Sequence, residues 1–154
     1  MDAFDLKIIE RLMENSRMKW ADLAAEIGLS APAAAERVNR LIEQGIIKKF
    51  GILIDGEAVG SELTAFVAVS LERPSYRAPF LELINHLDEV QECHHIAGED
   101  DYLLKIRCRN TKDLDRVVSH EIKGLQGIVR TRTTIVMDTA KESFRLPLNS
   151  SKML

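Results

Sequence analysis

Residues 20–50 constrain the fold more than any other segment, because they have the pattern of two short helices joined by a glycine-containing turn. Leu23 and Ile27 recur at the spacing of one apolar helix face. Gly28 can adopt the left-handed conformation that ends a helix, and Ser30 is a good N-cap for the next one. The pattern predicts a helix-turn-helix unit, with a plain helical hairpin as the alternative.

The second helix of this pair has an apolar side, with Ala34, Val38 and Leu41, and a more polar side. A polar outer face on the second helix is typical of a DNA reader, which places that helix in the major groove. We therefore predict DNA contacts from this face and from the basic segment after it: Ser30, Pro32, Ala33, Glu36, Arg37, Asn39, Arg40, Lys48 and Lys49.

Arg37 and Arg40 are the strongest of these candidates, because a guanidinium group pairs well with a guanine edge or a phosphate. The charge balance nevertheless predicts weak binding by one copy. Residues 1–50 carry eight basic and eight acidic side chains, and residues 37–49 have a net charge of +3. Since affinity for DNA grows with the number of phosphates neutralised, we expect several copies to act together.

Composition excludes several classes of protein. The net charge of −3 does not fit an indiscriminate binder of polyanions. No apolar run approaches the ~20 residues that span a membrane, and the N-terminal residues have no secretion-signal pattern. Cys93 and Cys108 give no disulfide framework and are expected to be buried thiols. We expect a cytoplasmic protein, associated with the nucleoid through its DNA binding.

The remainder of the chain predicts a first amphipathic helix at about 5–15, with Ile8 and Leu12 on its apolar face, and a second domain after the helix-turn-helix unit. Glycines at 51, 56 and 60 mark a change of composition between the two. The second domain has the order βαββαβ, which is that of the ferredoxin-like unit. Its expected strands are 64–72, 90–97, 102–109 and 127–140, and its expected helices are 80–87 and 110–124.

The predicted architecture is an α+β fold. Its expected parts are a three-helix, winged helix-turn-helix head at 1–50, a linker strand and hinge at 51–62, a ferredoxin-like effector and oligomerisation domain at 63–142, and a tail at 143–154. In the ferredoxin-like unit, helices cover one face of an antiparallel sheet. The other face needs a cover, and a second copy of the chain would supply one, which predicts a dimer.

Several short motifs match the pattern of a known family. They are Gly28-Leu29-Ser30, Glu36-Arg37-Val38, Gly98-x-x-Asp101-Tyr102 and Thr131-Arg132-Thr133. With the order of the two domains, they resemble the Lrp/AsnC (feast/famine) class of regulators over nearly the whole chain. The resemblance implies homodimers, often assembled into octamers, that bind double-stranded DNA. It also implies an amino acid or similar small molecule as effector, and transcriptional control with wrapping or bending of the DNA.

The same resemblance directs the search for an effector site to one loop and to the last strand. The predicted effector-binding residues are Gly98, Glu99, Asp100, Asp101, Thr133 and Thr134. Gly98 can adopt dihedrals that turn backbone amides toward a ligand carboxylate, and Asp101 could accept hydrogen bonds from a ligand ammonium. The family often has an aromatic or apolar residue where Glu99 and Asp100 stand. We hypothesise that this acidic loop favours a cationic or polar amino acid; the alternative is a tight turn with solvated acids.

No catalytic residues, metal ligands or cofactor are predicted. His94 and His95 are adjacent and would point to opposite faces of a strand, and no paired ligand spacing accompanies Cys93. Two other functions remain open at this point. One is a small-molecule-sensing oligomer that does not bind DNA. The other is an enzyme on the same scaffold that acts on tetrapyrroles, with His94 or His95 in its site.

Overall fold

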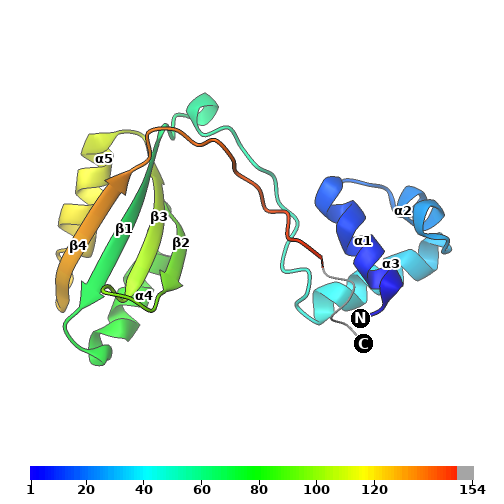
Figure 1. Cartoon of the computed structure of the whole chain (residues 1–154), viewed down its shortest axis with the longest axis horizontal. Helices are drawn as coiled ribbons and strands as arrows, with labels where there is room; N and C mark the ends of the chain where they lie inside the picture. Colours follow the sequence, from blue (N-terminus) through cyan, green and yellow to red (C-terminus); the bar gives the residue numbers. More distant parts are fainter. Residues whose placement is uncertain (149–154) are drawn as a thin grey trace. The chain divides into compact units, whose positions relative to one another are not determined.

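The computed structural model describes residues 1–148, and these divide into two compact units (Figure 1). One unit contains residues 1–53 together with the described segment 141–148, and the other contains residues 54–140. The tail predicted at 143–154 is described only as far as residue 148, and its last part lies outside the described residues.

The head contains three helices: α1 (Ala3–Glu14), α2 (Trp20–Ile27) and α3 (Ala31–Glu43). Helix α1 begins earlier than predicted because Asp2 caps it, and Asp2 and Asp5 each accept a hydrogen bond from the other's backbone N–H. Gly28 ends α2 with φ of 75°. The Ser30 hydroxyl oxygen then accepts from Ala33 N at 3.4 Å and caps α3. The predicted helix-turn-helix is therefore present.

A small apolar core holds the three helices together. Its buried members lie on the helix faces that the sequence periodicity indicated: Ile8, Leu12, Leu23, Ala24, Ile27, Ala34, Val38 and Leu41. Each helix contributes to this core, so the orientation of α3 depends on contacts with both other helices.

The predicted wing and linker strand do not form among the described residues. The stretch 48–55 has no regular structure, and the segment that follows contains only a 3₁₀ turn at Glu57–Val59. A strand requires a neighbour for its backbone N–H and C=O groups, and no described strand pairs with this stretch. Its apolar side chains remain exposed, with Ile52 at 76%.

The second unit contains an antiparallel sheet with the strand order β2-β3-β1-β4. Its elements, in chain order, are β1 (Leu63–Leu71), α4 (Arg77–Asn85), β2 (Val90–His95), β3 (Tyr102–Cys108), α5 (Thr111–Asp115), the π-helix η3 (Arg116–Ile122) and β4 (Ile128–Ile135). This confirms the predicted βαββαβ order. Strand β4 ends before the expected residue 140 because its partner β1 begins at Leu63, and Ile135 already pairs with Ala65.

The two faces of the sheet differ strongly. Ala65, Val67 and Val69 of β1 are fully buried on the face that α4 and α5 cover. Side chains alternate along a strand, so the intervening residues lie on the uncovered face. Members of that face on β1, β3 and β4 are Phe66, Leu103, Lys105, Arg130, Arg132 and Thr134.

The predicted helix at 110–124 is present, but its second half is a π-helix. Lys123 N donates to Val118 O, five residues earlier, at 3.0 Å. The same five-residue spacing brings Arg116 to Glu121 at 3.5 Å. Gly124 follows, where a Cβ atom would lie 2.2 Å from the carbonyl oxygen of His120. π-Helical turns are rare in proteins, and those that occur are often at functional sites.

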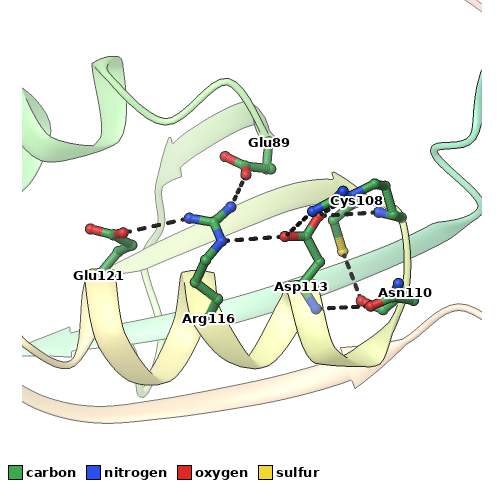
Figure 2. A network of polar contacts seen from close by, with 7 residues as sticks. Glu89, Cys108, Asn110, Asp113, Arg116 and Glu121 are labelled. Carbon is green, nitrogen blue, oxygen red and sulfur yellow. Dashed lines mark hydrogen bonds and ion pairs between the residues drawn. The ribbon is translucent and has the colours of Figure 1, made fainter.

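A polar network fastens the start of α5 to the rest of the domain (Figure 2). Asn110 caps α5 by accepting from Asp113 N at 3.0 Å. The buried Asp113 carboxylate accepts from Arg109 Nε at 3.2 Å and from Arg116 Nε at 3.3 Å. Arg116 also pairs with Glu89 in the loop before β2. One carboxylate therefore connects the end of β3 to α5, and Arg116 extends the connection to the α4–β2 loop.

Acid is expected to weaken this network as the pH falls from about 4 to about 2. The Arg109 guanidinium lowers the pKa of Asp113 from 3.8 to about 2, against the effect of burial, with help from Arg116. A depressed pKa stabilises the folded state above the unfolded value, and the benefit disappears as pH falls from about 4 to about 2. Asp113→Asn should thus be less stable than the wild type in urea unfolding at pH 5. The difference should shrink at pH 2; an equal difference at both pH values would contradict the assignment.

Candidate DNA-reading face and effector groove

Most of the predicted DNA contacts lie on the outside of the head. On α3, Pro32, Glu36, Asn39 and Arg40 are exposed and Ala33 is half-buried. The N-cap Ser30 and the basic pair at 48–49, which follows α3, are exposed as well. These residues form one candidate DNA-reading face, which can present hydroxyl, amide and cationic groups to a duplex.

Arg37 does not lie on this outward face. Its Nη1 atom is 2.7 Å from an oxygen of Asp2 and 2.8 Å from an oxygen of Asp5, and its guanidinium lies 5.3 Å from the centre of the Phe4 ring. The side chain is only 23% exposed, and that of Asp5 is 3% exposed. The capping carboxylates of α1 thus draw Arg37 toward α1. Arg40 reaches Asp5 at 3.2 Å but keeps 47% of its side chain exposed.

Asp5 is a buried carboxylate that Arg37 and the backbone of Asp2 keep charged. Burial alone would raise the pKa of Asp5, but the Asp2 N–H and the Arg37 guanidinium hold it below its ordinary value. The sequence carried a signal for this arrangement, since acids three residues apart at a helix start form a capping box. It did not indicate that the partner would come from α3, more than thirty residues away.

The predicted effector loop connects β2 to β3, and its acids are largely occupied by partners within the chain. Asp101 accepts from Leu71 N at 2.7 Å, and its own N–H donates to Val69 O at 3.0 Å. Glu99 is exposed and lies 3.2 Å from Arg132. Gly98 does not use the conformational freedom argued for it, because its φ is not positive. A Cβ atom at Gly98 would meet no other atom within 4 Å.

Asp100 is the most deeply placed acid of the loop, with its side chain 2% exposed. Its Oδ1 atom accepts from the Ser70 hydroxyl at 2.7 Å and from Arg130 at 3.1 Å, and its Oδ2 atom accepts from Arg132 at 2.5 Å. The Ser70 hydroxyl lowers the pKa of Asp100, against burial, and the two arginines add to the lowering. The carboxylate is therefore charged and fully engaged at neutral pH.

The remaining predicted effector residues lie on opposite faces of β4. Thr133 pairs with Val67 and lies on the helix-covered face, whereas Thr134 pairs with Phe66 and lies on the uncovered face with Arg132. The loop acids contact residues of that uncovered face. Within one chain, the structure therefore separates Thr133 from the loop.

Thr133 instead lines a groove between the α5–η3 helix and β4. We call it the effector groove because it is our candidate site for a small-molecule effector. Its volume is about 280 Å³, near the lower end of the range for small-molecule sites. It is lined by Thr111, Leu114, Asp115, Val118, Ser119, Lys123, Thr131, Thr133 and Ile135. Sequence reasoning missed every member except Thr133, because the helical residues carry no motif and become neighbours of β4 only in the fold.

The chemistry of the effector groove suits a zwitterion with an aliphatic side chain. Asp115 offers a carboxylate for an ammonium group, and Lys123 offers an ammonium for a carboxylate. Threonine and serine hydroxyls can donate or accept hydrogen bonds beside them. Leu114, Val118 and Ile135 supply apolar surface. Asp115 already accepts from the Ser119 hydroxyl at 2.7 Å, which holds the carboxylate in the groove.

The histidines and cysteines fall outside both candidate sites. His94 pairs with Glu92 at 2.9 Å, and the His95 ring lies 5.1 Å from that of Tyr102. Both cysteines are free, and burial raises the pKa of each thiol. Residues 1–148 contain no group of three or more potential ligands that could hold a metal ion. Among the same residues, no helix is long and apolar enough to cross a membrane.

Comparison with known proteins identifies both units. The sequence profile of the AsnC-type helix-turn-helix domain matches residues 1–42, and that of the Lrp/AsnC ligand binding domain matches residues 64–146. The chain is 36% identical over 145 residues to the proline dehydrogenase transcriptional activator of Rhizobium radiobacter, covering 93% of each protein. It is 32% identical over 152 residues to the leucine-responsive regulatory protein of Escherichia coli K12, covering 97% of this chain and 93% of that one.

Solved structures agree with these matches. A transcriptional regulator of Neisseria meningitidis in complex with L-methionine superposes with a TM-score of 0.90 at 28% identity, over 97% of each chain. A feast or famine regulatory protein of Mycobacterium tuberculosis, complexed with L-methionine, superposes with a TM-score of 0.86 at 31% identity, over 94% of this chain and 97% of that one.

Proposed function

The chain belongs to the Lrp/AsnC family of transcriptional regulators, and from this premise we propose that an amino acid controls it by binding in the effector groove. The chain is a DNA-binding regulator that responds to an amino acid or related small molecule, and it is not an enzyme. The observation that carries the proposal is the set of groups in the groove. An acid, a lysine, hydroxyls and aliphatic side chains together match the parts of an α-amino acid.

The side chains that line the groove favour an apolar amino acid. Asp115 and Lys123 would bind the ligand ammonium and carboxylate, leaving the ligand side chain against Leu114, Val118 and Ile135. Two structural neighbours hold L-methionine, which fits this preference. A cationic effector, as first hypothesised from the acidic loop, would need carboxylates that are not already paired. Asp100 is buried and engaged by two arginines, so it does not provide one.

We propose that the predicted residues outside the groove act in an oligomer. Gly98, Glu99, Asp101 and Thr134 lie across the sheet from the groove within one chain, so they would reach an effector only from a neighbouring copy. Asp100 is paired within its own chain and would not reach it. The uncovered sheet face carries the apolar residues Phe66 and Leu103 beside its charged ones. A second copy of the chain would bury this apolar surface. We therefore propose a homodimer, and octamers built from such dimers as the family resemblance implies.

For DNA binding we propose that the candidate DNA-reading face enters the major groove without Arg37. Arg40, Lys48 and Lys49 would supply phosphate contacts, while Pro32, Ala33, Glu36 and Asn39 would meet base edges. Ser30, the N-cap of α3, would lie beside the DNA sugar-phosphate backbone. Few cations per head imply weak single contacts, so an oligomer would bind several DNA segments at once. Such a protein would act in the cytoplasm, on the nucleoid.

Calorimetric titration of the full chain with L-methionine, L-leucine, L-lysine and L-arginine tests the effector proposal. We expect methionine or leucine to bind, and to change a gel shift of the protein on its own upstream DNA at low salt. Binding of lysine or arginine alone would favour the acidic loop as the specificity element. If none of the four binds, the effector proposal fails, and if no DNA shift occurs at low salt, the proposed reading face fails.

A further inference from the structure

We infer that Asp100 is a positioning residue that fastens β4, the strand forming one wall of the effector groove, and does not itself touch the effector. The inference rests on the proposed function for the role of the groove. The fastening itself rests on contacts within this chain. We call the group formed by Asp100, Ser70, Arg130 and Arg132 the β4 clasp.

The β4 clasp joins three segments that are distant in sequence. Asp100 comes from the loop before β3, Ser70 from the end of β1, and the two arginines from β4. Both carboxylate oxygens of Asp100 are used, at distances of 2.7, 3.1 and 2.5 Å. A carboxylate with a 2%-exposed side chain is tolerated only when it is paired and hydrogen-bonded. Turning it toward a ligand would break three contacts at once.

Strand β4 depends on such a fastening because it lies at the edge of the sheet. In the strand order β2-β3-β1-β4, its backbone pairs with β1 on one side, and no described strand lies on its other side. The β4 clasp adds a side-chain connection from β4 to the loop. Asp101, the next residue, bonds Val69 O and Leu71 N, so the same loop is also fixed to β1.

Alternation along β4 connects the clasp to the groove. Arg130 and Arg132 point to the uncovered face, where they meet Asp100, while Thr131 and Thr133 point to the groove. A displacement of the arginines therefore displaces both groove threonines relative to α5–η3.

The test compares Asp100→Asn with the matched control Asp88→Asn in the full chain. Both changes remove one carboxylate charge from the same domain and keep the side-chain size. Asp88 is exposed in the loop before β2 and belongs neither to the β4 clasp nor to the groove lining. Hydrogen exchange is followed at the amides of Glu72 and Val136, which donate to Gly127 O and Thr64 O and so join the two ends of β4 to β1. Calorimetric titration is carried out with L-methionine and L-leucine.

For Asp100→Asn we expect exchange at these amides to be about tenfold faster and amino-acid affinity to be about tenfold weaker. Both values should stay within about twofold of wild type for Asp88→Asn. Weaker binding with unchanged exchange would show that Asp100 contacts the ligand and would overturn the inference, as would equal effects of the two variants. Unchanged exchange in Asp100→Asn also overturns it. If neither amino acid binds the wild type, the effector proposal fails, while the exchange data still decide whether Asp100 fastens β4.

Discussion

Replacing Arg37 by alanine is expected to destabilise the head and not to alter which DNA sequence the protein prefers. Arg37 pairs with Asp2 and Asp5 and lies over the Phe4 ring, so the substitution removes the main connection between α3 and the start of α1. Asp5 would remain buried with only Arg40 as a cationic partner. Removing one member of a buried ion pair leaves an uncompensated charge, which costs far more than the loss of an exposed pair.

The expected result is a fall of roughly 10 °C in the melting temperature of the head. Trp20 is the only tryptophan of the chain and belongs to α2, so its fluorescence reports on the head alone. DNA binding should weaken at temperatures where the head is partly unfolded, and it should weaken similarly for all sequences.

Arg40→Ala is the matched control, because Arg40 is one helical turn away, is about half exposed and makes a single 3.2 Å contact with Asp5. This variant should melt nearly as wild type and lose DNA affinity with a shallower salt dependence, as expected for a lost phosphate contact. If Arg37→Ala instead melts as wild type and relaxes the preference at one base pair, Arg37 reads DNA and its contacts with α1 are incidental.

Local patterns predicted the elements of this fold well, because the signals are contained within a few residues. Gly28 and Ser30 mark the turn between α2 and α3. As predicted, Gly28 adopts the left-handed conformation and the Ser30 side chain caps α3. Apolar alternation and the order of elements were sufficient to predict an antiparallel sheet in a βαββαβ unit. The prediction of a linker strand was wrong for a physical reason: an extended apolar stretch becomes a strand only where another strand offers hydrogen bonds.

The candidate sites were harder to predict, because their side chains are brought together across long separations. Nothing local to α3 indicates that Arg37 is held against α1 by two carboxylates, whereas Arg40 makes one contact with α1 and keeps about half of its side chain exposed. The acids at 99–101 suggested ligand binding, but Asp100 is paired with β4, some thirty residues later. The effector groove combines a helix with a strand, and the π-helical geometry of η3 leaves no clear mark in the sequence.

Filling the effector groove should abolish the response to the amino acid. Ser119 lines the groove, and its residue is exposed, so Ser119→Trp can place an indole in the space of about 280 Å³ without disturbing the core. The large side chain would take the volume that the ligand needs and would separate Asp115 from its hydroxyl partner. We expect at least about a hundredfold loss of affinity for the effector amino acid, which corresponds to about 2.8 kcal/mol.

DNA binding at low salt should remain, because the head is unchanged, but it should no longer respond to the amino acid. His120→Trp is the control: His120 is the next residue of η3, is exposed and does not line the groove. This variant should keep both the affinity and the response, and circular dichroism should give wild-type melting for both. Equal binding by the two variants would exclude the groove as the effector site.

Equal loss of amino-acid binding in both variants, with lowered melting temperatures, would show that η3 tolerates no tryptophan. In that case, Thr133→Val, which keeps the side-chain shape and removes one groove hydroxyl, becomes the deciding variant, and unchanged affinity there would count against the groove.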